Sequence, residues 1–483
     1  MVLPPRVGPG LVAEYSGSSG ARPVGEGTRG CTDATIVRRV SRSENRVRER
    51  GEDARRLHIG LSLAPTWLSG EGWRREDSRV AELFDSNLYV DLARRGEAAA
   101  LDFVFKPDSL FVDPDTLAGS PGFSSLDPTV LLATLARETS RIGLVTTAST
   151  TFNPPYVVAR QLQSLHWASE GRAGWNIVTS LDGQGNFGVT EMPSARDRYV
   201  RAAEFTHVVR KLWESYPHRA IHEDRAGGVY ADSAQVKAID HQGEHFRVEG
   251  PSTVPTHPSG EIPLFQAGAS PDGRDFAASV ADAVFAASPD IEAGTELRED
   301  LRARAVAHGR DPDSLLVLPG LSMFLGNTSA QARELHRATY ARLNAERRFA
   351  SIESAVGLDL RAADPSSPVP VEGLADPDRP VRSRTHSDLF RRFILRERPT
   401  VAQLLERPEV VASAHWVVVG TPDDAVREIV DRVAHGLDGF IALPGGSWES
   451  IDLFFDQVIP RLVDLGLFRS EYAGRTLREH LAE

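Results

Sequence analysis

Polar side chains follow several short apolar segments of this sequence, at the points where strands would end. Thr147 follows the apolar run in GLVTT, Asp108 follows LDFVF, and Asn176 and Ser180 lie in WNIVTS. In a parallel barrel the carboxyl ends of the strands form one rim, where ligands bind. A hydroxyl in such a place can also serve only the loop backbone. Two consecutive strands with polar tips favour a ligand site.

A second candidate site is the segment GASPDGRD, Gly268 to Asp275, which lies between a predicted strand and a predicted helix. Backbone N–H groups at a helix start form an anion site, and the Ser270 hydroxyl can add a further donor. Such a turn suits a phosphate, although glycine-rich turns between strands and helices are common. It is not a Walker sequence, because no Gly-Lys-Ser/Thr follows. The glycine spacing also differs from the dinucleotide fingerprint.

The elements that must position these residues alternate between strand and helix. Asp127 and Pro128 predict a helix start, and Pro154-Pro155 predict another. The short strands between the helices are apolar on both faces, which is typical of a parallel sheet covered by helices. Repetition of this unit along the chain predicts an α/β fold, a (β/α)8 TIM barrel with insertions. A doubly wound open sheet is the competing fold, but we find no switch point for it.

The domain organisation predicted from the sequence is one barrel over residues 57–483. Residues 1–56 are rich in Gly, Ser and Arg without periodicity, which predicts a disordered extension. Residues 217–261 and 347–412 interrupt the rhythm and are predicted insertions. We interpret the second, which is rich in proline and charge, as a mobile flap at the barrel mouth.

Composition excludes several classes of function. The 483 residues carry a net charge of −12, which argues against nucleic acid as a partner. No apolar run reaches the roughly 18 residues of a membrane span, so no membrane partner is expected. The single cysteine, Cys31, excludes an internal disulfide and fits a cytoplasmic location. His241 and His245 lie in a glycine-interrupted segment that is typical of a surface loop and offers no further ligands, so no metal site is expected. No G-x-S-x-G elbow is present.

The segment ASTTFNPPYVVARQLQSLHWASEGRAGWNIVTS, Ala148 to Ser180, closely resembles bacterial-luciferase-like flavin-dependent monooxygenases. Within that superfamily it is similar to the branch of nitrilotriacetate monooxygenase component A and dibenzothiophene-sulfone monooxygenase. The resemblance runs from about residue 58 to the C-terminus and includes the ending IPRLVDLGLFRSEYAGRTLREHL. It implies a TIM barrel that binds FMN in its reduced form, FMNH2.

The resemblance also assigns cofactor-binding residues, while it names no catalytic residue. It places Ser270 on the flavin phosphate, Tyr199 on the flavin, and Thr147 and Asp108 near the flavin ring. The sequence departs from the family pattern at two points. Ala195 stands where the family has a flavin-contacting histidine in His-Asp-x-Arg-Tyr. Lys106-Pro107 precede Asp108, where the family has an alanine directly before the aspartate.

The implied function is the oxygenase component of a two-component FMNH2-dependent monooxygenase. A separate NAD(P)H:FMN reductase would supply the reduced flavin, and one atom of O2 would enter a small organic substrate. Five apolar residues suggest a hydrophobic or aromatic xenobiotic, with dehalogenation or desulfurisation as the reaction: Trp67, Phe103, Phe105, Phe111 and Phe152. Alternatives are a deazaflavin-dependent dehydrogenase of the same superfamily and a non-catalytic flavin-binding homologue. We expect a homo-oligomer.

Overall fold

Eight parallel strands close a ring in the computed structural model, which describes residues 56–483 except 269, 344, 378, 380, 382–383, 408–409 and 411–414. The ring runs β1, β2, β3, β4, β9, β10, β11, β13 and back to β1. The predicted TIM barrel is therefore confirmed. The predicted disordered extension lies outside the described residues, apart from Arg56. The ring strands are β1 (His58–Ser62), β2 (Phe103–Lys106), β3 (Gly143–Ser149), β4 (Ala173–Val178), β9 (Leu264–Gln266), β10 (Ala283–Ala286), β11 (Leu316–Leu325) and β13 (Gly439–Pro444).

A ninth strand, β12 (Trp416–Gly420), joins the sheet without closing the ring. It pairs with Leu321–Leu325, the second half of the long strand β11, whereas β10 pairs with the first half. Leu321 has β12 as one neighbour and β13 as the other. The long β11 thus carries β12 on the edge that β10 leaves open.

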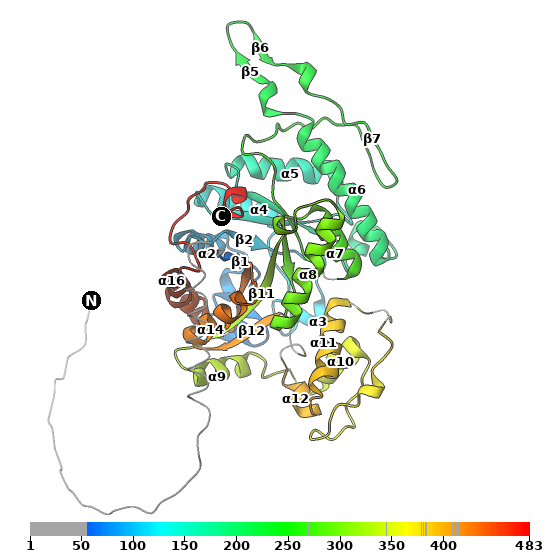
Figure 1. The fold of residues 1–483 in the computed structure, drawn as a ribbon, viewed down its shortest axis with the longest axis vertical. Helices are drawn as coiled ribbons and strands as arrows, with labels where there is room; N and C mark the ends of the chain where they lie inside the picture. The colour runs from blue at the N-terminus through cyan, green and yellow to red at the C-terminus, as the bar shows by residue number, and fades with distance from the viewer. Residues whose placement is uncertain are drawn as a thin grey trace, which may run out of the picture.

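Helices cover the outside of the ring, as the two-sided apolar strands require (Figure 1). The predicted caps are present: the Asp127 carboxylate accepts from Val130 N at 2.9 Å, and Pro128 opens its helix. Among the described residues, no helix is both long and apolar enough to cross a membrane. The principal helices of the barrel are α2 (Ser86–Ala98), α4 (Pro128–Glu138), α5 (Pro155–Ala168), α6 (Ala195–Glu214), α7 (Pro271–Val280), α8 (Ile291–Ala307), α9 (Ser329–Thr339), α14 (Pro422–Val433), α15 (Trp448–Leu453) and α16 (Ile459–Asp464).

The barrel interior is a packed apolar layer rather than a channel. The rings of Phe103 and Phe265 meet at 5.0 Å between centroids, and those of Phe105 and Phe285 at 5.4 Å. Leu477, in the C-terminal helix α17 (Leu477–His480), belongs to the same cluster and is fully buried. A Cβ at Gly143 or Gly174 would collide with its side chain. The C-terminal helix therefore plugs the amino-terminal end of the barrel and leaves the carboxyl rim for ligands.

The first insertion, 217–261, forms two antiparallel hairpins that extend beyond α6 (Figure 1). Glu204 of α6 fixes the second hairpin: it accepts from the backbone N–H groups of His245 and Phe246, and it lies 2.9 Å from His241 Nε2. His241 therefore pairs with a carboxylate. Within the described residues, no group of His, Cys, Asp and Glu could hold a metal ion. The hairpin strands are β5 (Ile221–Asp224), β6 (Val229–Ala231), β7 (His241–Gln242) and β8 (Arg247–Val248).

The described part of the second insertion forms three helices with a hydrophobic core of their own, at the place where the sequence predicted a mobile flap. The helices are α10 (Ala345–Val356), α11 (Arg384–Glu397) and α12 (Val401–Leu405), here called the helical insertion. Ile352, Phe390 and Leu404 are each at most 1% exposed and belong to one cluster, separate from those of the barrel. The proline-rich segments between the helices interrupt the helical periodicity, so the sequence pattern did not predict these helices.

Candidate functional site

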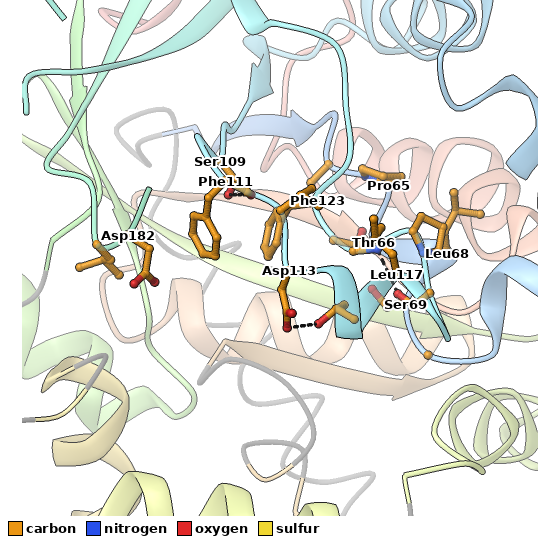
Figure 2. Close-up of a pocket in the computed structure, with 18 of the residues that line it drawn as sticks. Pro65, Thr66, Leu68, Ser69, Ser109, Phe111, Asp113, Leu117, Phe123 and Asp182 are labelled. Carbon is orange, nitrogen blue, oxygen red and sulfur yellow. Dashed lines mark hydrogen bonds between the residues drawn. The ribbon is translucent and has the colours of Figure 1, made fainter. Parts of the chain in front are cut away.

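A cavity of about 820 Å³ opens at the carboxyl rim of the barrel. Its walls come from the loops that follow β1, β2 and β4, from the first turn of α6, and from Val381 at the edge of the helical insertion. A volume of this size suits a small organic ligand. In Figure 2 the rings of Phe111 and Phe123 point the same way, and Leu68 and Leu117 belong to the same lining. The lining of the cavity is mainly apolar.

The longest wall is the segment between β2 and α4, which includes the short helix α3 (Pro114–Leu117). Lys106, at the tip of β2, fixes both ends of this wall: its Nζ donates to Pro107 O at 3.2 Å and to Ser125 Oγ at 3.0 Å. Asn186, after β4, donates to Leu110 O at 2.8 Å. The Lys106 side chain is buried, and this burial lowers the pKa of its amine to about 8. Lys106, which departs from the family pattern before Asp108, therefore holds this loop wall in place.

The turn between β9 and α7 brings Ser270 and Tyr199 together. Ser270 is the N-cap of α7, and its Oγ accepts from Gly273 N at 3.2 Å. Tyr199, in the first turns of α6, places its hydroxyl against the same turn. A Cβ at Gly273 would lie 2.7 Å from that hydroxyl, and a Cβ at Gly268 would also collide with it. The turn thus gathers two hydroxyls and two glycines at the amino terminus of α7, where a helix start favours a phosphate.

Thr147 and Asn176 form a second pair, on the neighbouring strands β3 and β4. Their Cα atoms are register partners, and Asn176 Nδ2 donates to Thr147 Oγ1 at 2.9 Å. Both side chains are buried. Asn176 Oδ1 has no hydrogen-bond partner among the described residues. A buried acceptor of this kind calls for a donor, and a ligand with N–H groups, such as a flavin ring, would provide one.

Asp108 lies just past the tip of β2 and is partly buried. Burial raises the pKa of its carboxyl, although the N–H of Ser109 and the charge of Lys106 act in the opposite direction. No hydrogen bond joins Asp108 to Thr147, Tyr199 or Ser270 within the described part of the chain. Ser180, the other polar residue after β4, already has a hydrogen-bond partner: its Oγ lies 2.7 Å from Ser149 Oγ.

The four predicted flavin contacts thus share the carboxyl rim, but the structure gathers them only in part. Tyr199 and Ser270 both lie against Gly273, Thr147 instead pairs with Asn176, and Asp108 forms no hydrogen bond with the other three described residues. Among the described residues that line the cavity, none of these four occurs, whereas their chain neighbours Ser109 and Arg198 do. Their roles toward the flavin stay predictions.

Ala195 is the first residue of α6, and it is exposed. The family histidine at this position would stand on the same helix as Tyr199, one turn earlier. Its replacement removes a polar group at the start of α6, and the first turn keeps the Ser194 cap, whose Oγ accepts from Asp197 N at 3.2 Å.

Among the five apolar residues that the sequence suggested for the pocket, only Phe111 lines the cavity in the described structure. Trp67, Phe103 and Phe105 are core residues, each at most 1% exposed, and Phe152 stacks on Phe187 at 4.6 Å between ring centroids. Sequence reasoning missed Arg198, which lines the cavity. The signal available was its position in RDRY, directly before Tyr199.

Comparisons with known proteins agree with this geometry. The profile of the family described as luciferase-like monooxygenase matches residues 72–439. Nitrilotriacetate monooxygenase component A of Aminobacter aminovorans is 34% identical over 88% of this chain and 96% of its own length. Dibenzothiophene-sulfone monooxygenase of Rhodococcus erythropolis (strain XP) is 37% identical with the same coverage.

A solved structure of similar sequence is that of riboflavin lyase, determined with a modified FMN and its substrate riboflavin. It is 32% identical to this chain and superposes with a TM-score of 0.74. The match covers 88% of this chain and 95% of the other. The resemblance inferred from Ala148 to Ser180 is therefore confirmed across most of the chain.

Proposed function

The chain belongs to the luciferase-like monooxygenases, a family of flavin-dependent enzymes, and we propose that it is the oxygenase component of a two-component system. In this proposal reduced FMN binds at the carboxyl rim and O2 is the oxidant. One oxygen atom enters a small organic substrate and the other leaves as water, with two electrons supplied by the flavin. The substrate is hydrophobic or aromatic, with oxidative dehalogenation or desulfurisation as the reaction.

The observation that carries the proposal is the turn between β9 and α7. The α7 amino terminus and the hydroxyls of Ser270 and Tyr199 would hold the FMN phosphate, because both hydroxyls lie against Gly273 in this turn and a helix start favours an anion. Asn176 Oδ1, buried and unpartnered among the described residues, would accept from an N–H of the flavin ring.

The apolar residues of the cavity lining would orient the substrate and exclude water. Reduced FMN, when bound, supplies the redox chemistry. The apolar side chains of Phe111, Leu117 and Phe123 would exclude water from the adjacent cavity once a substrate covers them, which favours transfer of oxygen to the substrate over its loss to solvent. Such chemistry needs neither a nucleophile nor a metal from the protein.

A separate NAD(P)H:FMN reductase completes the system in this proposal. The spacing G-x-G-x-x-G occurs at residues 25–30, outside the described residues, and at residues 183–188. The second copy opens no α-helix, since α6 begins only at Ala195, so it lacks the context of a dinucleotide fingerprint. A relative over most of its length bears the name component A, which is the name of one part of a larger system. The reduced flavin would reach the rim from that second protein.

The test is a coupled reaction with an unrelated NADH:FMN reductase, isotopically labelled O2 and a panel of aromatic sulfones, halogenated phenols and aminopolycarboxylates. The expected result is one labelled oxygen atom in a product, formed in proportion to NADH consumed. Complete conversion of O2 to hydrogen peroxide with every compound would favour a non-catalytic flavin-binding homologue. Hydride transfer to or from a deazaflavin without O2 would identify a dehydrogenase instead.

A further inference from the structure

Arg198 is the one cationic side chain among the described residues that line the rim cavity. It is partly buried, in the first turn of α6. Its Nη1 donates to Pro193 O at 2.6 Å, while its Nε is buried and has no hydrogen-bond partner in the described structure. No carboxylate of a described residue forms an ion pair with it. Its fork of N–H groups is therefore only partly used.

The surroundings of Arg198 do not favour a bare positive charge. Burial lowers the pKa of its guanidinium, and the nearby Tyr199 and Asp182 oppose this effect only in part. The second acid of the lining, Asp113, is used elsewhere: its carboxylate caps α3 and accepts from Asp115 N at 3.0 Å and Thr116 Oγ1 at 2.8 Å. A partly buried cation without a fixed partner is stabilised by an anion that the ligand brings.

The rest of the lining is suited to an apolar body. Phe123 is 67% exposed, Val112 46% and Leu117 44%, so large apolar side chains stand open at this face. Apolar side chains left open around a concave surface mark a binding site for an apolar group. Arg198 supplies the polar contact that would fix the orientation of such a ligand.

We propose that the cavity takes an organic acid, with an aromatic or bulky apolar body and a carboxylate or sulfonate group held by Arg198. The planar guanidinium can grip either group with two parallel N–H donors. This inference rests on the proposed function, since it names the substrate class of the same site. The flavin phosphate is the other anion that could reach Arg198, and the experiment separates the two.

The probes are naphthoate and its neutral amide, naphthamide, titrated into the full chain by calorimetry. Wild-type protein is expected to bind naphthoate more tightly than naphthamide by roughly ten- to a hundredfold, the range for a hydrogen-bonded charge pair. Arg198→Met should abolish this preference, and Arg198→Lys should restore part of it. Arg196→Met, at an exposed position of the same helix, is the matched control and should keep the preference. Far-ultraviolet circular dichroism establishes that each variant is folded.

Equal affinity of wild-type protein for the two probes would overturn the proposal. So would an Arg198→Met variant that keeps the naphthoate preference but loses affinity for reduced FMN and not for reduced riboflavin, because Arg198 would then serve the flavin phosphate. A wild-type protein that binds naphthoate through Arg198 but fails to bind reduced FMN would support the acid site and contradict the proposed function. The two failures are therefore distinguishable.

Discussion

Ser270 has two tasks at the start of α7, and a single substitution separates them. Its Oγ caps the helix, and it would also hold the flavin phosphate. We predict that Ser270→Ala lowers the free energy of unfolding by about 1 kcal/mol through the lost cap. It should also weaken binding of reduced FMN by roughly 1 to 3 kcal/mol through the lost charged hydrogen bond. Chemical denaturation and anaerobic titration measure the two effects.

Thr421→Ala is the matched control, because Thr421 caps α14 away from the proposed phosphate turn. It should cost similar stability and leave the affinity for reduced FMN unchanged. Equal flavin affinity in Ser270→Ala and wild-type protein would remove Ser270 from the phosphate role.

Lys106 gives a prediction about pH. Burial lowers the pKa of its amine to about 8 in the folded protein, whereas a lysine in the unfolded chain titrates near about 10.4. Between these values the unfolded chain holds a proton that the folded chain has released. The free energy of unfolding should therefore rise with pH across this window, by about 3 kcal/mol in total.

Lys106→Met should lack this rise, and Lys237→Met, at an exposed lysine, should keep it. Urea denaturation from pH 7 to 11 in all three proteins gives the comparison. The same slope in wild type and Lys106→Met would show that the buried amine is not the group that titrates.

At the residue scale, the sequence identified the site residues that belong to a family motif. It missed the residues whose roles depend on their burial in the folded protein. Ser270 and Tyr199 came from the resemblance, and the structure brings them together. The partner of Thr147 was visible only as a polar residue on the next strand, Asn176. Arg198 and Lys106 could not be assigned, because their roles depend on a loop wall that the chain builds from distant segments.

At the scale of elements, the helical insertion is attached to the barrel through charges. Arg392 of α11 lies 2.7 Å from Glu296 of α8, and Arg396 pairs with Asp290 and Glu292. These residues are partly exposed, and exposed ion pairs contribute about 0 to 1 kcal/mol each. The insertion keeps a core of its own, so it can stay folded while its attachment weakens.

We predict that Arg392→Gln combined with Arg396→Gln loosens this attachment by about 1 to 2 kcal/mol. The measurement is a spin-label distance between Glu299→Cys on α8 and Leu395→Cys on α11, with Cys31→Ser. The distance distribution should broaden in the double variant and, in wild type, at high salt. Arg361→Gln, whose partners Glu346, Glu353 and Asp359 all lie within the insertion, is the control and should leave it narrow. Unchanged distributions would show that the charges do not hold the insertion.

Elements were predictable where burial dictates the residue pattern. The strands of the ring are apolar on both faces, and the strands predicted from LDFVF, GLVTT and WNIVTS correspond to β2, β3 and β4. The helices of the insertion were missed, because the proline-rich text between them interrupts the pattern. The place of β12 outside the ring was also hidden, since its sequence WVVVG is that of any buried parallel strand.

At the scale of the whole molecule, stability and function occupy opposite ends of the barrel. The amino-terminal end is closed by Leu477 and by a buried charge cluster around Asp102. Asp102 accepts from Ile59 N at 2.6 Å, and it lies 3.0 Å from His58 Nδ1 and 2.9 Å from Arg469 Nη2. Burial would raise the pKa of Asp102, but His58, Arg469 and the Ile59 N–H together hold it below its ordinary value.

We predict that Asp102→Asn lowers the free energy of unfolding by about 3 to 5 kcal/mol, because Arg469 loses a buried partner. Since the folded pKa of Asp102 is depressed, its contribution is complete above the unfolded value of about 3.9 and is lost as pH falls through the folded value. Wild-type protein should therefore lose part of its advantage over the variant in acid. Denaturation at pH 7 and below pH 4 measures this, and a constant difference between the two proteins would contradict it.

The most direct test of the proposed function is an anaerobic calorimetric titration of the full chain with reduced FMN, oxidised FMN and reduced deazaflavin in turn. A rim that serves a two-component oxygenase should bind one reduced FMN per chain, more tightly than oxidised FMN and more tightly than the deazaflavin. Absence of binding by reduced FMN, or a preference for the deazaflavin, would contradict the proposal that this barrel is an FMNH2-dependent oxygenase.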